Sequence, residues 1–346
     1  MIQYSTGKGK KNRSADVVAL QLLLNEVDIA KIKPAENVPD ANVEYILSKG
    51  SSQTNIEQLP ALKVDGLSIA PLVARIEIYQ KAKKMKLVDG WISKRGGTLK
   101  ALLKDAGVTA SKTRMSYIRN KIPRPNGVNV ISVDKALSLY QKQYASLSAD
   151  DKEGLRYILS TAKCDTEVTF IPELAYMLAT TKHETAHTFR GIEEYGKGAS
   201  RPYGKEITVT DPKTKKAYKN KYYGRGYVQL TWGYNYQRID HKLGNGTFPN
   251  RNKVKVADYN KGFTISDPSK SIYLNPQKAL KKEVAYTGLI WGMHKGIYTG
   301  RKISNYVTTG KIDYINARRV INGTDKASKI ANYAEDIEIL LRTSTL

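Results

Sequence analysis

The sequence predicts a mainly α-helical protein with a small N-terminal part and a larger C-terminal one. Apolar residues recur at helical spacing in several segments, and Ser14, Pro71 and Pro172 stand where helices commonly begin. Hydrophobic residues make up 40% of the 346 residues, which is enough for packed cores. We expect helices over residues 16–27, 71–80, 132–144, 150–161, 172–190, 279–292, 312–320 and 327–341.

The first domain is expected over residues 1–85: a helix, a polar loop to about residue 60, an extended stub with an Asp-Gly turn, and a second helix. This order resembles the small peptidoglycan-binding domain family. The matching pieces are Leu-Gln-Leu-Leu-Leu-Asn at 20–25, Lys-Val-Asp-Gly at 63–66 and Ile-Glu-Ile-Tyr-Gln at 76–80. Ser68-Ile69 and Tyr79 depart from the family's glycine and phenylalanine, so a helical bundle without a ligand remains the alternative.

Residues 86–147 are expected to form a connector, interrupted by Gly96-Gly97 and by the Pro-Arg-Pro-Asn-Gly run at 123–127. Residues 148–346 then form a continuous helix-rich domain. Within it, residues 205–222 are rich in lysine and predict a loop or a hairpin.

Charge and cysteine content limit the functional classes. The net charge of +25 favours binding to polyanions. Because the sequence contains no recognisable nucleic-acid-binding module, we expect the partner to be an anionic cell wall and not nucleic acid. Cys164 is the single cysteine, which rules out an intramolecular disulfide and a cysteine-based zinc cluster. No apolar stretch is long enough to cross a membrane, and the polar, basic start is unlike a secretory signal peptide.

The chemistry is expected near the end of the helix over 172–190, which buries Leu174, Met177, Leu178 and Thr181. Glu184 falls on the same apolar stripe. A carboxyl there either pairs with a cation or stays protonated to higher pH than a free glutamate, and it is either a general acid or a structural residue.

Glu193 lies nine residues after Glu184, and Gly191 is expected to end the helix between them. The chain can then double back and bring Glu193 or Glu194 toward Glu184. Two carboxylates on opposite walls of a groove are the minimum for glycosidic hydrolysis.

Residues 183–187 also read His-Glu-Thr-Ala-His, the zinc-peptidase signature, with both histidines expected on one helix face. The extended version of that signature fails, because Arg190 and Glu193 occupy the required Gly and His positions. A zinc peptidase with His183 and His187 as ligands is therefore kept as an alternative.

Four motifs in order resemble the family 19 glycoside hydrolases, the chitinase and phage-endolysin group. They are His-Glu-Thr at 183–185, the Gly-Arg-Gly run at 222–236, Trp-Gly-Met-His at 291–294 and Asn-Ala-Arg-Arg-Val-Ile-Asn-Gly at 316–323. The resemblance covers residues 150–346 and implies a lysozyme-like α-helical fold.

By position, the resemblance implies Glu184 as general acid and Glu193 or Glu194 as the base, with Glu193 favoured. Thr231 is expected to help hold the attacking water. The sugar-contacting or groove-shaping positions are Gln229, Asn235, Tyr223, Trp232 and Asn322, and Arg319 is expected to support the charge of the substrate-binding cleft. Because the family inverts configuration, the two carboxyls are expected roughly 6.5–9.5 Å apart.

The chain lacks the disulfide-forming cysteines of plant chitinases, and its two acids are closer in sequence. Both departures favour the phage lytic branch and peptidoglycan, with chitin as the alternative substrate. We therefore expect a peptidoglycan hydrolase of the lysozyme type, without metal or cofactor, that is a phage endolysin or an antibacterial effector. It would be made in the cytoplasm and delivered to the periplasm or wall by a holin or a secretion system, with an immunity protein as a further partner of an effector.

Overall fold

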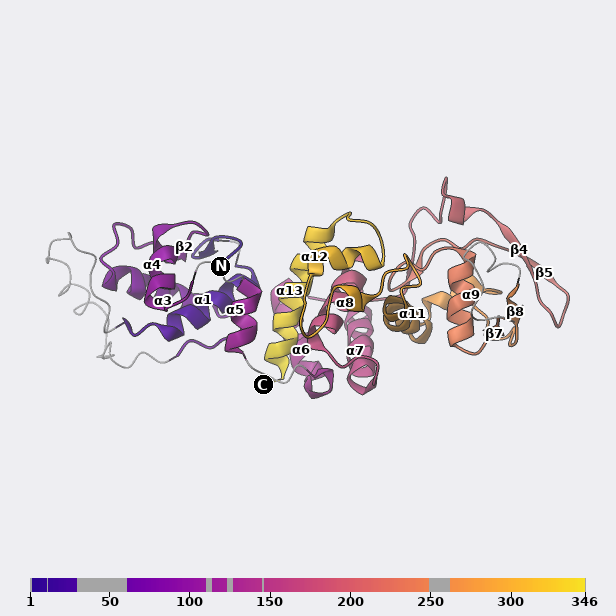
Figure 1. Cartoon of the computed structure of the whole chain (residues 1–346), viewed down its shortest axis with the longest axis horizontal. Helices are drawn as coiled ribbons and strands as arrows, with labels where there is room; N and C mark the ends of the chain where they lie inside the picture. Colours follow the sequence, from indigo (N-terminus) through magenta and orange to yellow (C-terminus); the bar gives the residue numbers. More distant parts are fainter. Residues whose placement is uncertain are drawn as a thin grey trace. The chain divides into compact units, whose positions relative to one another are not determined.

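The computed structural model describes residues 2–10, 12–29, 61–109, 114–122, 127–144, 146–248 and 262–345. The chain is mainly helical and divides into two compact units, Met1–Pro125 and Asn126–Leu346 (Figure 1). The division falls inside the connector predicted over 86–147. Part of that segment belongs to each unit, since α4 (Gly97–Asp105) and α5 (Arg114–Lys121) lie in the first and α6 (Val133–Tyr144) in the second.

The first unit is built around one buried helix. Its elements are β1 (Thr6–Gly7), α1 (Ser14–Glu26), α3 (Ile69–Ala82), β2 (Trp91–Ile92), α4 (Gly97–Asp105) and α5 (Arg114–Lys121). Helix α1 packs against α3, α4 and α5, and Asp16 at its start is buried and pairs with Arg114 at 2.6 Å. The predicted Asp-Gly turn is present: Gln21 accepts the N–H of Gly66, which has a φ of 73° that suits glycine.

The second unit is organised around α8 (Ile171–Glu184), which is buried along nearly its whole length. Helix α13 (Ala327–Ser344) packs along it, and α6 (Val133–Tyr144), α7 (Ala149–Cys164) and α11 (Lys282–Lys295) share the same core. The remaining helices are α9 (Gly233–Lys242), α12 (Tyr314–Ala317) and the 3-10 turns η4 (Val128–Val130), η5 (Pro202–Gly204), η7 (Pro276–Leu280), η8 (Ile303–Asn305) and η9 (Arg318–Val320).

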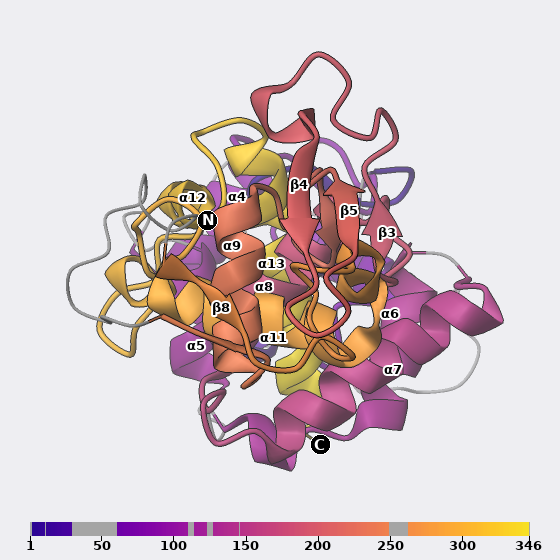
Figure 2. The ribbon, with the colours of Figure 1, turned by 90° about the vertical axis from the view of Figure 1, so that its right-hand side faces the viewer.

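The strands of the described residues are short and pair only two at a time. In the second unit the antiparallel pairs are β3 (Ile192–Glu193) with β6 (Arg225–Gly226), β4 (Ile207–Thr210) with β5 (Ala217–Asn220), and β7 (Gly246–Thr247) with β8 (Thr264–Ile265). The lysine-rich segment is thus a hairpin, with β4 and β5 side by side (Figure 2). No helix of the described residues is long and apolar enough to cross a bilayer.

The helix predicted over 172–190 ends earlier, at Glu184, so Gly191 does not end it. The hydroxyl of Thr185 donates to the carbonyl of Thr181 and accepts the N–H of Phe189, which replaces helical hydrogen bonds with a compact turn. Within that turn Ala186 and Phe189 have φ values of 50° and 55°. The chain therefore reverses before Gly191 and reaches β3 within a few residues.

Candidate active site

Glu184 stands at the last position of α8 and is paired with a buried arginine. The Nη1 of Arg318 lies 2.6 Å from Oε1 of Glu184, and the side chains are 3% and 16% exposed. The Nε of Arg318 also donates to the carbonyl of Asp325 at 3.1 Å. Because Glu184 lies on an apolar stripe, its carboxyl was expected either to pair with a cation or to stay protonated. In the structure it pairs with a cation. A charge in such a position is tolerated because its partner is present.

Arg318 reaches Glu184 because the segment after α12 is fixed to the core. The hydroxyl of Tyr314 hydrogen-bonds the carbonyl of Pro172 and the buried carboxylate of Glu338, and its ring stacks on Tyr176 at 5.8 Å. Arg318 follows Tyr314 by four residues, so both side chains point into the unit.

Arg319 was expected to support the charge of the cleft. In the structure, the Nε of Arg319 donates to Oδ1 of Asn316 at 3.3 Å, and Arg318 is the residue that pairs with Glu184. The four-residue spacing from Tyr314 was a usable signal for this. Asn322, in the same late motif, is exposed and its side chain accepts the N–H of Gly323.

The last turn of α8 is anchored by a buried lysine. The Nζ of Lys182 donates to the hydroxyl of Tyr140 and lies 3.9 Å from the ring centre of Tyr144 and 5.3 Å from that of Tyr333. Burial lowers the pKa of this lysine to about 8. Its carbonyl accepts the N–H of His187 at 2.8 Å, so the cage of tyrosines also fixes the turn that follows Glu184.

Glu193 lies in β3, directly opposite Arg225 of β6. Its Oε1 accepts hydrogen bonds from the hydroxyl of Tyr223 at 2.5 Å, from Gln277 at 2.8 Å and from the Nε of Arg225 at 3.2 Å. Lys197 lies 3.8 Å from the other oxygen, Oε2. Three donors therefore converge on one oxygen, while the side chain keeps 25% of its surface exposed.

These donors set the charge of Glu193. Its partial burial acts to raise the pKa of the carboxyl, but the hydrogen bonds from Tyr223 and Gln277 and the charges of Arg225 and Lys197 outweigh it, and the pKa is lowered. Glu193 is therefore ionised at neutral pH, so it has no proton to donate and can take part in proton transfer only as an acceptor.

Glu194 has a different set of contacts. Its backbone N–H donates to the carbonyl of Gly224 at 2.7 Å, and its Oε2 accepts the N–H of Gly224 at 3.0 Å. Its other oxygen accepts the hydroxyl of Tyr203 at 2.9 Å. Both carboxylate oxygens thus accept a hydrogen bond, and the two bonds with Gly224 extend the pairing of β3 with β6.

The Gly-Arg-Gly run forms β6 and a tight turn that the amides of the motif hold together. The amide nitrogen of Gln229, at a φ of 56°, donates to the carbonyls of Ile192 and Gly226, each at 3.3 Å. The amide nitrogen of Asn235 donates to the carbonyl of Thr231 at 3.0 Å, while its Oδ1 is buried without a hydrogen-bond partner. Gln229 and Thr231 thus lie in the segment between β6 and α9, and Asn235 lies in the first turn of α9.

Two aromatic residues of this run differ in exposure. The Tyr223 ring is 6% exposed and lies 3.6 Å beneath the guanidinium of Arg225, so it is part of the Glu193 network. Trp232 is 38% exposed, with the rings of Tyr203 and Tyr234 each 5.8 Å away. An exposed indole flanked by two phenols offers a flat apolar face of the kind that stacks on sugars.

The expectation that His183 and His187 share a helix face is wrong. Helix α8 ends at Glu184, and His187 has a φ of 73° in the turn beyond it. Of the other histidines, His294 pairs with Glu173 at 2.8 Å. Among the described residues, no group of three or more His, Cys, Asp or Glu side chains could hold a metal ion. The zinc-peptidase alternative therefore lacks its ligand geometry.

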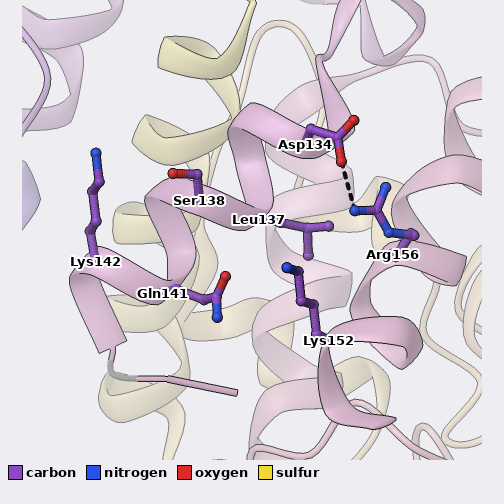
Figure 3. A pocket seen from close by; sticks show the side chains of 7 residues that line it. All are labelled: Asp134, Leu137, Ser138, Gln141, Lys142, Lys152 and Arg156. Atoms are coloured by element: carbon purple, nitrogen blue, oxygen red, sulfur yellow. Dashed lines mark hydrogen bonds and ion pairs between the residues drawn. The ribbon is translucent and has the colours of Figure 1, made fainter. Parts of the chain in front are cut away.

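A pocket of about 460 Å³ lies between α6 and α7 (Figure 3). Its walls are mostly polar and include three basic side chains, of which Arg156 pairs with Asp134 at 2.6 Å. The full lining comprises Asp134, Leu137, Ser138, Gln141, Lys142, Lys152 and Arg156. None of the residues predicted for catalysis or substrate binding lines this pocket.

Comparison with protein-family models, with curated proteins and with solved structures finds no match to this chain. Functional inference therefore depends on the arrangement around Glu184 and Glu193.

Proposed function

We propose that this protein hydrolyses the glycan strands of bacterial peptidoglycan, with Glu184 and Glu193 as the two carboxyl groups. The observation that supports this is the position of the two glutamates. Helix α8 ends at Glu184 and strand β3 contains Glu193, and each carboxylate is bound by its own arginine, Arg318 or Arg225. Both side chains keep partial exposure, which a substrate requires. The lysozyme-like fold and the family 19 resemblance are part of the same proposal.

The two roles follow from the surroundings. Glu193 is the base: its lowered pKa leaves it ionised, and it takes a proton from the water that attacks the anomeric carbon. Glu184 is the acid: once its ion pair with Arg318 loosens, the carboxylate takes up a proton from solvent and gives that proton to the glycosidic oxygen as the bond to carbon breaks. One water is consumed and one new reducing end is formed. Because Glu184 is bound to Arg318 in the free protein, that ion pair must loosen when the substrate enters.

Glu193 is favoured over Glu194 as the base. The donors on Glu193 converge on Oε1 and leave Oε2 with a lysine at 3.8 Å, and in this proposal the attacking water binds at Oε2. Both oxygens of Glu194 already accept hydrogen bonds. In this proposal Thr231 helps to hold the water, and Trp232 stacks on a sugar ring.

For the first unit we propose wall binding. The support is the turn in which the side chain of Gln21 is bonded to Asp65 and Gly66 between α1 and α3. For the whole chain we propose an antibacterial role, as a phage endolysin or as an effector delivered by a secretion system.

The deciding experiment measures turbidity loss of purified peptidoglycan and of colloidal chitin, followed by mass analysis of the fragments. We expect wild type to clear peptidoglycan faster than chitin and to release reducing, non-anhydro muropeptides. Glu184→Gln and Glu193→Gln should each reduce the rate by about a thousandfold or more, and Glu194→Gln by about tenfold or less. Lysis that survives Glu184→Gln, or fragments with cut peptide bonds, would refute the proposal.

A further inference from the structure

The β4–β5 hairpin presents a concentration of positive charge that the proposed chemistry does not use. Residues 205–221 contain six lysines and two carboxylates. All six lysines are exposed, and none lies within ion-pair distance of a carboxylate in the part of the chain that the structure describes. They are Lys205, Lys213, Lys215, Lys216, Lys219 and Lys221.

The two faces of the hairpin have different composition. Ile207, Val209 and Tyr218 pack on the core cluster beneath it, and strand alternation turns Thr208, Thr210 and Lys219 outward. The outward face therefore offers ammonium groups and hydroxyls. It has no large apolar side chain that could insert into a membrane.

Three of the lysines lie at the tip, which Figure 1 shows at the outer edge of the second unit. The carboxylate of Asp211 does not offset them by pairing, because it accepts the backbone N–H groups of Lys213 and Thr214 and so holds the turn. From Lys205 and Lys221 to the tip the hairpin is roughly 20 Å long. The Debye length at 0.1 M salt is about 10 Å, so the charges of lysines as close in the chain as Lys213, Lys215 and Lys216 are not fully screened from one another.

We propose that this hairpin binds a linear, base-free polymer of phosphodiesters, of the polyol-phosphate kind, by its charge. The absence of arginine and the position of the sole aromatic ring of residues 205–221 argue against nucleic acid. That ring, on Tyr218, is packed on the core side, so nothing on the hairpin can stack on bases. Lysines act as separate point charges and suit a flexible chain of phosphates without fixed geometry. The proposal is independent of the glycan chemistry proposed above.

The test compares binding of the full chain to lipid-free poly(glycerol phosphate) at salt concentrations from about 0.05 M to about 0.2 M. One variant replaces four hairpin lysines by glutamine: Lys213, Lys215, Lys216 and Lys219. The matched control removes the same charge from exposed lysines elsewhere in the second unit: Lys142, Lys163, Lys295 and Lys311. Thermal unfolding checks that each variant is folded, and four Lys→Arg substitutions in the hairpin should retain binding.

We expect the hairpin variant to lose affinity by about tenfold or more at low salt and its salt slope to fall by roughly three, while the control stays within about threefold. Equal losses in the two variants would mean that net charge alone binds, and no loss in either would exclude the hairpin. Tighter, hairpin-dependent binding to DNA of equal phosphate number, or to phosphatidylglycerol vesicles, would also overturn the proposal.

Discussion

The two candidate acids are held in place by different means. Glu184 ends the most deeply buried helix of the second unit, and its arginine comes from 134 residues later in the chain. Glu193 lies in a two-residue strand, and most of its donors come from Tyr223 and Arg225 in the neighbouring strand segment. Core packing therefore fixes the first acid, and a local polar network fixes the second. Substitutions near Glu184 should mainly change stability, and those near Glu193 should mainly change activity.

The largest expected effect is on the Glu184 side. Arg318→Met leaves a mostly buried carboxylate without its cation, and we expect the free energy of unfolding to fall by about 3–5 kcal/mol, measured by urea denaturation. Arg319→Met is the control, because that side chain donates to Asn316 and pairs with no carboxylate of the described residues, and it should cost about 0.5 kcal/mol in the free energy of unfolding. Combining Arg318→Met with Glu184→Gln should recover part of the loss. Equal costs at positions 318 and 319 would contradict the assignment.

The next effect is the pH dependence of stability that comes from Lys182, in the last turn of the helix that carries Glu184. Burial lowers the pKa of Lys182 to about 8 in the folded chain, below its unfolded value near 10.5. The unfolded state therefore binds more protons above pH 8, and stability rises with pH there. From pH 7 to about pH 9.5, Lys182 should add about 2 kcal/mol to the free energy of unfolding.

Lys182→Met should remove this alkaline gain, and the exposed Lys163→Met on α7 should keep it. Asp336 acts to raise the pKa of Lys182 and Lys329 acts to lower it, so both remain unchanged in the test. Urea denaturation at each pH measures the difference between variant and wild type. If that difference does not depend on pH, Lys182 does not titrate in this range.

The sequence predicted structure well where buried apolar residues recur at helical spacing. It predicted structure poorly where side-chain hydrogen bonds determine the path of the chain. The core positions of α8 could be predicted because Leu174, Met177 and Leu178 repeat at helical spacing and are all buried in the structure. Its end could not, because the hydroxyl of Thr185 replaces helical hydrogen bonds, and a single threonine is a weak signal.

Strands β3 and β6 were beyond prediction for a related reason. A two-residue strand has no period to detect, and its pairing depends on a long-range contact. Helix α9 was missed because Tyr234, Tyr236 and polar residues give it a weak apolar stripe. Pairing of Glu184 with a cation was one of two alternatives that the sequence left open, and the sequence named no partner; Arg319, expected to support the cleft charge, is the neighbour of the arginine that binds Glu184.

The smallest expected effect on stability, and the most selective on activity, is at Tyr223. Tyr223→Phe keeps the ring under Arg225 and removes one of three donors to Glu193. The free energy of unfolding should therefore fall by about 1 kcal/mol. Because the folded-state pKa of Glu193 is lowered, its network stabilises the fold above the unfolded pKa, and this contribution is lost as pH falls through the lowered value. Losing a donor raises that pKa. The acid limb of the rate of peptidoglycan hydrolysis should therefore move to higher pH, while Tyr203→Phe, which touches Glu194, should leave the limb in place. If Tyr203→Phe moved the acid limb and Tyr223→Phe did not, the base would be Glu194 and not Glu193. The second acid would then be the one fixed by Tyr203 and Gly224.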